Sequence, residues 1–268
     1  MDFLNVFLVL NGQGAVAIAE RGLIIHAVLL MLIVAVPVFL LIFLIAWRYR
    51  AGRRSRARYA PDWEHGKMEE LVWWAIPIEI VLILGALTWS STHQLDPRKP
   101  LPGGTPLVVQ VVALDWKWLF LYPEQKIATV NYIAVPVDRP LRFEITADAP
   151  MNSFWIPQLG GQIYAMTGMM STLHLVANKP GTFKGLSANY SGEGFAGMQF
   201  TVVATPQEEF DAWIQTVKES PQILDQSAYR MLARPSIANP AAYYGSFDQD
   251  LLSSIMKKFT GDAPQVQH

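Results

Sequence analysis

Two long apolar runs constrain the fold of this chain more than any other feature. The first extends from Leu23 to Trp47 without a charged residue, and the second extends from about Leu71 to Thr92 with one acid, Glu79. The hydrocarbon core of a bilayer, about 30 Å thick, is spanned by about 20 helical residues, so both runs are long enough. A cleaved signal peptide would be shorter and would not be followed by a second run. The sequence predicts two transmembrane helices, 23–47 and 71–92, in a hairpin over 21–95.

The segment between the runs predicts their orientation. Residues 48–70 carry seven basic residues, whereas Arg21 is the only one before the first run: Arg48, Arg50, Arg53, Arg54, Arg56, Arg58 and Lys67. Positively charged loops stay on the cytoplasmic side, so we expect both termini on the outer side. The arginines could alternatively serve as anchors for anionic lipids, which gives the same orientation.

Composition excludes several classes of function. The net charge is −1 and only 16% of the residues are charged, so a nucleic-acid-binding protein is not expected. The chain has no cysteine, which excludes disulfides, zinc–thiolate sites, iron–sulfur clusters and thiol nucleophiles.

The remainder of the chain predicts an outer domain. A short outer segment covers 1–20, and a proline-containing linker covers 96–106. From Leu107 the apolar residues alternate with polar ones, most strictly over 141–146 and 199–202. Short alternating runs separated by turn residues predict an antiparallel β-sandwich over 107–204.

Helical patterns return in the last segment, 205–268. Thr205 to Glu208 form a predicted capping box, followed by an apolar face of Phe210, Trp213, Ile214 and Val217. A second helix is predicted after Ser246, with five residues on its buried side: Leu251, Leu252, Ile255, Met256 and Phe259.

Four motifs occur in order along the chain. They are Glu70 to Pro77, Asp115 to Trp118 (Asp-Trp-Lys-Trp), Met151 to Pro157 (Met-Asn-Ser-Phe-Trp-Ile-Pro) and the loop Ser187 to Met198. In this order and spacing the chain resembles subunit II of the haem–copper respiratory oxidases. The resemblance implies a two-helix transmembrane hairpin followed by an all-β cupredoxin-like sandwich with C-terminal helices.

The departures from that family select a branch. Copper-binding members carry two cysteines and two histidines in these motifs, because a dinuclear copper centre needs bridging thiolates and imidazoles. Here the matching positions are Ser187, Ser191, Asn152 and Phe195, and only the methionine ligand, Met198, is kept. Asn189 replaces the acid that usually lies between the cysteines. The resemblance is therefore to the copper-free bo-type ubiquinol oxidases, and no metal or cofactor is expected on this chain.

That branch implies partners and one proton-handling residue. Haems, copper and the ubiquinol site are expected in a catalytic subunit I, which reduces oxygen to water and pumps protons. Further small membrane subunits and a bacterial inner membrane are also implied. Glu70 matches an acid at the mouth of a proton pathway, although an acid at a helix N-terminus is ordinary. Glu79 has no family role, and an acid within a span must be neutral, paired or hydrated.

Other features favour ordinary structural roles. Trp116 and Trp118 are two apart and predict one strand face in the core or at a subunit interface. His93 and His174 are interpreted as hydrogen-bonded structural residues, and four methionines as core filling: Met166, Met169, Met170 and Met198.

Three alternatives stay open. The chain could be an electron-carrying cytochrome c oxidase subunit II, although the missing thiolates argue against it. It could also be a membrane-tethered binding or sensor module. Many relatives are lipoproteins, and whether this N-terminus is processed or lipidated stays open.

Overall fold

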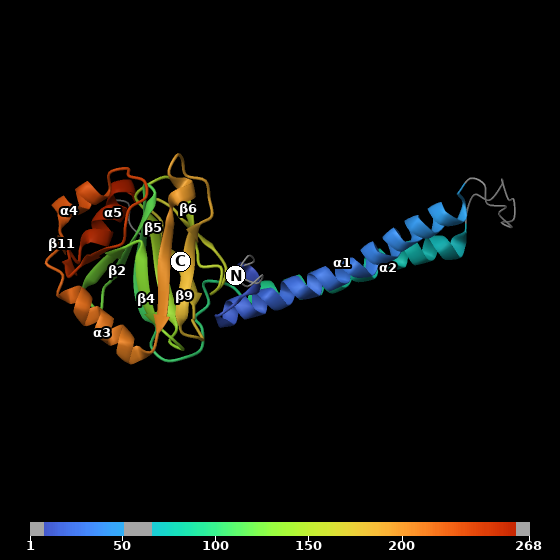
Figure 1. Ribbon diagram of the computed structural model, residues 1–268, viewed down its shortest axis with the longest axis horizontal. Helices are drawn as coiled ribbons and strands as arrows, with labels where there is room; N and C mark the ends of the chain where they lie inside the picture. Colours follow the sequence, from blue (N-terminus) through green and yellow to red (C-terminus); the bar gives the residue numbers. More distant parts are fainter. Residues whose placement is uncertain (1–7, 51–65, 261–268) are drawn as a thin grey trace. The chain divides into compact units, whose positions relative to one another are not determined.

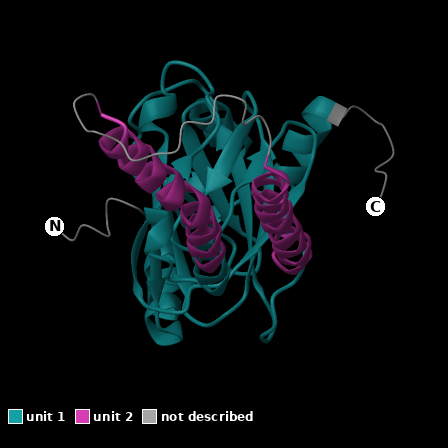
Figure 2. Cartoon of the chain, turned by 90° about the vertical axis from the view of Figure 1, so that its right-hand side faces the viewer, with its two compact units in different colours: residues 1–21, 97–268 teal, residues 22–96 magenta. Residues whose placement is uncertain are grey.

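The computed structural model describes residues 8–50 and 66–260 and separates the chain into two compact units. One unit comprises residues 22–96, and the other combines residues 1–21 with residues 97–268 (Figure 2). Most of the predicted loop 48–70, the start of the segment 1–20 and the end of the segment 205–268 lie outside the described residues.

The first unit is helical. Helix α1 covers Ala15–Arg48 and α2 covers Lys67–Gln94, and each predicted span lies inside one of them (Figure 1). Both helices are long and apolar enough to cross a membrane. Pro37 in α1 and Pro77 in α2 lie within continuous helices, and each lacks the N–H that would bond the preceding turn.

The second unit is a β-sandwich of two large sheets. The first sheet has the strand order β12-β3-β2-β1-β5-β8, and the second has the order β4-β10-β9-β6-β7. Their strands are β1 Leu107–Leu114, β2 Lys117–Tyr122, β3 Ile127–Val130, β4 Tyr132–Pro136, β5 Leu141–Ala147, β6 Asn152–Trp155, β7 Ile163–Ala165, β8 Ser171–Leu175, β9 Gly181–Ser187, β10 Gln199–Thr205 and β12 Ala242–Tyr244. Strands β11 Ile223–Leu224 and β13 Ser246–Phe247 form a small parallel pair.

The predicted antiparallel pairing is wrong in two places. Strands β1 and β5 pair in parallel, with Leu107 opposite Leu141, and β4 and β10 also pair in parallel. Three strands intervene between β1 and β5 along the chain, which gives the connection room to return in the same direction. Local alternation reports only which residues are buried, so it could not predict this pairing.

The core between the sheets is rich in aromatic rings. Phe154 and Phe200 stack with ring centroids 5.1 Å apart, and Trp118 meets both rings edge-on. All three side chains are buried. Large aromatic rings exclude water from the core, and their stacked and edge-on contacts stabilise it beyond the burial of apolar area.

The C-terminal helices explain why β1 and β2 are buried on both faces. Val112, Leu119 and Leu121 point away from the inter-sheet core and form a second apolar cluster with Leu252 and Ile255 of α5 (Leu251–Thr260). Helix α4 (Gln226–Leu232) adds Tyr229 to this cluster. The C-terminal extension therefore covers the outer face of the first sheet, as Figure 1 shows for α4 and α5 beside β2.

Three details of the predicted C-terminal helices are corrected or refined. Helix α3 (Gln207–Lys218) buries Phe210, Ile214 and Val217 as predicted, but its N-cap is Pro206 and no side chain caps it. The predicted capping box fails because Thr205 is the last residue of β10, in register with Pro136. Phe259 is 42% exposed rather than buried, and the Nζ atom of Lys258 lies 5.1 Å from the centroid of its ring.

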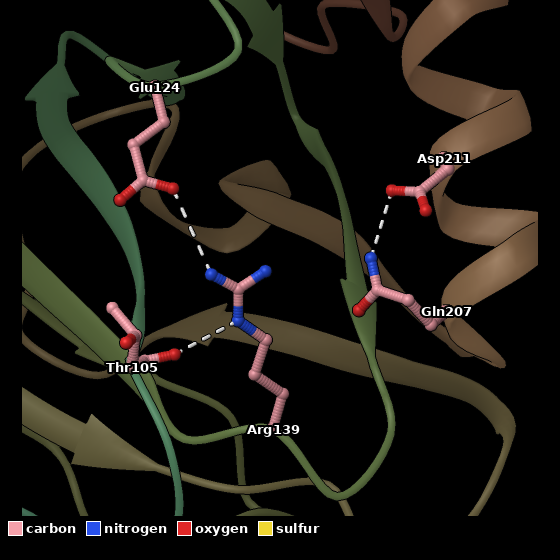
Figure 3. A network of polar contacts seen from close by, with 5 residues as sticks. All are labelled: Thr105, Glu124, Arg139, Gln207 and Asp211. Atoms are coloured by element: carbon pink, nitrogen blue, oxygen red, sulfur yellow. Dashed lines mark hydrogen bonds and ion pairs between the residues drawn. The ribbon is translucent and has the colours of Figure 1, made fainter.

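Exposed polar contacts of Arg139 attach the end of the linker to the sandwich and join two of its loops. Arg139, between β4 and β5, donates from Nε to the carbonyl oxygen of Thr105 at 3.1 Å, and its guanidinium lies 3.8 Å from the Glu124 carboxylate (Figure 3). In the first turn of α3, Gln207 donates to Asp211 at 2.9 Å. Exposed contacts of this kind position a loop but contribute little stability.

The predicted N-terminal turn docks onto the sandwich. The backbone N–H of Gln13 donates to the Gln158 carbonyl at 2.7 Å, and the Asn178 N–H donates to the Gln13 carbonyl at 2.9 Å. Gly14 is buried, and a Cβ at this position would clash with the carbonyl oxygen of Val176. Only glycine allows the backbone to approach this closely.

Candidate functional site

The loop between β9 and β10 and the start of β6 meet at one end of the sandwich. Ser187 ends β9, Met198 precedes β10, and the Ser187 N–H donates to the Met198 carbonyl at 3.2 Å. Asn152 begins β6, whose Phe154 lies opposite Ser187 in the neighbouring strand. Residues far apart in sequence are thus assembled by the pairing of β6 with β9.

Asn152 is the centre of this assembly. Its side chain is buried and donates from Nδ2 to Ser191 Oγ at 2.9 Å and to Met198 Sδ at 3.2 Å. Its Oδ1 atom accepts the backbone N–H of Ser153 at 2.7 Å. The amide of Asn152 therefore uses both donors on neutral partners and fixes the loop without any charge.

The two tryptophans reach the same loop from the other sheet. Trp118 donates from Nε1 to Ser187 Oγ at 3.1 Å, and Trp116 donates from Nε1 to the Ser191 carbonyl at 3.0 Å. They do not share a strand face, so that part of the prediction is wrong, but Trp118 is buried in the inter-sheet core and Trp116 packs against it, as predicted. Trp116 lies in the two-residue turn between β1 and β2 with φ of 63°, where Leu114 opposes Lys117. A side chain at Gly194 would collide with the Trp116 ring, so glycine is required there.

Asn189 and Phe195 lie in the loop but contact other residues. Asn189 donates from Nδ2 to the Met151 carbonyl at 3.1 Å, and Phe195 meets the ring of Tyr190 with centroids 5.7 Å apart. The structure therefore joins Asn152, Ser191 and Met198 directly, with Ser187 held by Trp118.

The methionines divide between two environments. Met198 is buried, as core filling predicts, but Met169 is 56% exposed and Met170 is 38% exposed. The core-filling interpretation is wrong for these two residues, because they lie in the turn just before β8 rather than in a strand.

This donor set does not fit a dinuclear copper centre. Asn152, Ser187 and Ser191 offer a neutral amide and two hydroxyls, and Met198 offers one thioether, whereas copper pairs need thiolate bridges and imidazoles. Among residues 8–50 and 66–260 there is no cluster of three or more histidine, cysteine or acidic side chains. The sulfur atom of Met198 already accepts the Asn152 hydrogen bond.

Glu70 and Glu79 lie at different positions along α2, and both side chains are exposed. Glu70 is in the first turn, its backbone N–H donates to the Gly66 carbonyl at 2.9 Å, and its side chain is exposed. Glu69 occupies the same turn. Glu79 follows Pro77 in the middle of the helix and is exposed on its surface.

The histidines have structural partners, as predicted. His174 is buried in β8 with Nδ1 3.1 Å from the Pro97 carbonyl, and His93 Nδ1 lies 2.8 Å from the Trp89 carbonyl. Each ring therefore uses one nitrogen to fix a neighbouring backbone group.

Sequence reasoning missed the residues that hold the C-terminal extension. Buried Lys117 donates from Nζ to the Arg234 carbonyl at 2.8 Å, and the buried carboxylate of Asp148 accepts the Tyr229 hydroxyl at 2.7 Å and the Lys258 ammonium. Burial lowers the pKa of Lys117, with Asp115 acting in the opposite direction, and burial raises the pKa of Tyr229. A lysine at the start of an otherwise apolar and aromatic run was the available signal.

Comparison with known proteins decides the family. Residues 122–205 match the family described as cytochrome C oxidase subunit II, periplasmic domain, and residues 218–263 match the COX aromatic rich motif. The chain is 51% identical over 253 residues to the cytochrome bo(3) ubiquinol oxidase subunit 2 of Pseudomonas putida, covering 94% of this chain and 80% of that protein. The chain belongs to the subunit II family of ubiquinol oxidases.

A second relative agrees with this assignment. The ubiquinol oxidase subunit 2 of Acetobacter aceti is 46% identical over 271 residues, covering 97% of this chain and 88% of that protein. The predicted family and the predicted cupredoxin-like fold after two apolar helices are thereby confirmed. As a ubiquinol oxidase subunit II, the chain is a member of an oxidoreductase complex with a catalytic subunit I, and its helices fit an inner-membrane protein.

Proposed function

We propose that this ubiquinol oxidase subunit II has no copper centre, carries no electrons and is a non-catalytic but required part of a proton-pumping complex. The observation that carries this proposal is the hydrogen-bonded group of Asn152, Ser191 and Met198. It fills the place of a metal with neutral donors whose hydrogen bonds are satisfied internally. A chain without a redox group cannot relay electrons from a soluble donor.

Electrons then enter the complex elsewhere. Ubiquinol dissolved in the membrane reaches the catalytic subunit directly, and the haems and copper of that subunit reduce oxygen to water. Further small membrane subunits complete the assembly. The printed names of the two relatives, both ubiquinol oxidase subunits, support this scheme.

Copper analysis tests the proposal. We expect no copper in the purified full-length chain after dialysis against a weak chelator. The matched positive control combines Asn152→His, Ser187→Cys, Ser191→Cys and Phe195→His, which restores the ligand types at the same spacing. Stoichiometric copper in the unaltered chain would refute the proposal and favour an electron-carrying cytochrome c oxidase subunit.

We also propose that Glu70 collects protons from the cytoplasm for the catalytic subunit. Its position in the first, exposed turn of α2 supports this role, because a carboxylate there can exchange protons with bulk water. Glu79 lies nine positions further along, about half a turn around the helix, so the two acids do not share one straight path.

Replacing Glu70 with glutamine tests this role. The change keeps the shape and removes the titratable group, so quinol oxidation should slow while haem content and assembly stay unchanged. The loss should be about tenfold or more if proton uptake becomes limiting. Glu69→Gln is the matched control, because it removes an acid from the same helical turn. If the two substitutions have equal effects, or if Glu70→Gln turns over normally at neutral and alkaline pH, Glu70 is only an acid at a helix N-terminus and has no role in proton uptake.

A further inference from the structure

One face of α2 carries an acid that the described chain does not cover. We define the Glu79 face as the residues of the span 71–92 that lie within about 40° of Glu79 at about 100° per residue: Val72, Ala75, Glu79, Ile83, Ala86 and Ser90. Glu79 is exposed and makes no hydrogen bond or ion pair with any residue that the structure describes.

The contact of α2 with its own hairpin lies on another face. Four residues of α2 are half-buried, and all others in this helix are exposed: Ile80, Leu84, Leu87 and Ser91. Their spacing forms one stripe, about 110° around the helix from Glu79. On α1 the half-buried positions include Leu23, Ala27 and Leu30, which form a matching stripe. Since α1 is the other helix described in this unit, the two stripes face each other and Glu79 points away from their contact.

The depth of Glu79 makes lipid a poor neighbour. Trp74 lies about 8 Å toward one end of the helix and Trp89 about 15 Å toward the other, by a rise of about 1.5 Å per residue. Tryptophans favour the two bilayer interfaces, so Glu79 lies inside the apolar layer. An acid there faces protein or water rather than lipid tails, because hydrocarbon offers it no hydrogen bonds.

Three residues of the Glu79 face suit a close helix contact. Ala75, Ala86 and Ser90 are small, and small residues let two membrane helices approach and place polar groups within hydrogen-bonding distance. The larger Val72 and Ile83 lie on the side of this face toward the α1 contact. The third face of α2 differs, because it exposes Trp74 by 62%, Ile78 by 53% and Trp89 by 72%. Large apolar side chains of this kind suit lipid.

We propose that the Glu79 face docks against a transmembrane helix of the catalytic subunit, which presents a hydrogen-bond donor or a cation to the Glu79 carboxyl group. The proposal rests on the proposed function, which supplies that subunit as the partner. Glu79 requires such a partner, because it is the one acid of α2 beyond the first turn and α1 does not cover it.

Photo-cross-linking in the assembled oxidase tests the docking face. A small diazirine amino acid is placed at Ala75 or Ala86, and at Ile78 or Val81 as controls of similar depth on other faces. After irradiation, we expect the haem-bearing subunit to cross-link to the first pair and lipid to cross-link to the controls. Lipid adducts at Ala75 and Ala86, or equal protein cross-linking at all four sites, would overturn the proposal.

Substitution of Glu79 tests its polar contact. Glu79→Gln keeps the hydrogen-bonding capacity, whereas Glu79→Leu removes it, so only the second should lower the haem recovered per chain, by about threefold or more. Unchanged recovery with Glu79→Leu would overturn the polar contact. Failure of the unaltered chain to copurify with any haem-bearing subunit would instead refute the proposed function, so the two failures are distinguishable.

Discussion

At the scale of single residues, uncharged side chains stabilise the loop between β9 and β10. A metal site would hold the loop through charged ligands, whereas here Asn152, Ser191 and Met198 hold it through a buried amide. Such a network stabilises only when each donor has a partner, because an unpaired buried polar group costs more than the bond contributes. The loop between β9 and β10 is therefore held to the start of β6 by the hydrogen bonds of Asn152.

Lys117 is a second residue whose role is set by burial. Its ammonium group donates to the Arg234 carbonyl and to Ser236, which fixes the segment after α4 to β2. Lys117→Met should lower the free energy of unfolding by about 1–3 kcal/mol, since the Arg234 carbonyl and the Ser236 hydroxyl lose the donor supplied by the buried Lys117 side chain. Thermal unfolding of the full-length chain in detergent measures this, with exposed Lys184→Met as the control. Equal losses in the two variants would contradict the prediction.

The pH dependence of Lys117 has a definite sign. Burial lowers the pKa of Lys117 below its ordinary value of 10.5, so the unfolded chain binds this proton more tightly. The stability contributed by Lys117 should therefore rise with pH between the lowered pKa and 10.5. The Lys117→Met variant should lack this rise, and a parallel pH profile in both proteins would contradict it.

At the scale of elements, the C-terminal helices are attached to the sandwich at both their apolar and polar sides. Their apolar residues cover Val112, Leu119 and Leu121 on the outer face of the first sheet. Asp148, just after β5, accepts hydrogen bonds from Tyr229 of α4 and Lys258 of α5. One buried carboxylate therefore joins two helices to a strand end, and both helices should loosen together when it loses a partner.

Tyr229→Phe tests this joint attachment. It keeps the ring and removes a hydrogen bond to a charged group, so hydrogen exchange in α4 and α5 should accelerate together. The folded chain holds the Tyr229 proton more tightly because its pKa is raised above the ordinary 10.0, so this contribution is present below pH 10 and is lost as pH rises further. Exposed Tyr190→Phe is the control. Acceleration in α4 alone would contradict the shared anchor.

At the scale of the whole molecule, the distribution of basic residues predicts the membrane orientation. We predict that residues 48–70 are cytoplasmic and that the sandwich lies on the periplasmic side, because basic loops resist translocation. Protease added to intact spheroplasts should cut after Pro100 and spare the segment Arg48 to Lys67. In lysed spheroplasts the protease should cut both regions. Cleavage only in the basic segment of intact spheroplasts would show that the orientation is the opposite of the predicted one.

Much of this protein was determined by local sequence. The two apolar runs, the lack of cysteine and the alternation over 141–146 each depend on composition or on a short period, so they predicted helices, excluded thiolate ligands and located strands. The motif around Ser187 to Met198 likewise predicted the family, because its spacing survives even though the ligand residues differ.

The tertiary structure decided what depends on distant contacts. The parallel pairing of β1 with β5, the turn at Trp116 and the exposed Phe259 follow from how strands and helices close around the core. The same closure brings Asn152 to Ser191 and Met198, across 39 and 46 positions. Local periodicity carries no information about such partners, because they are selected by the packing of the complete sandwich.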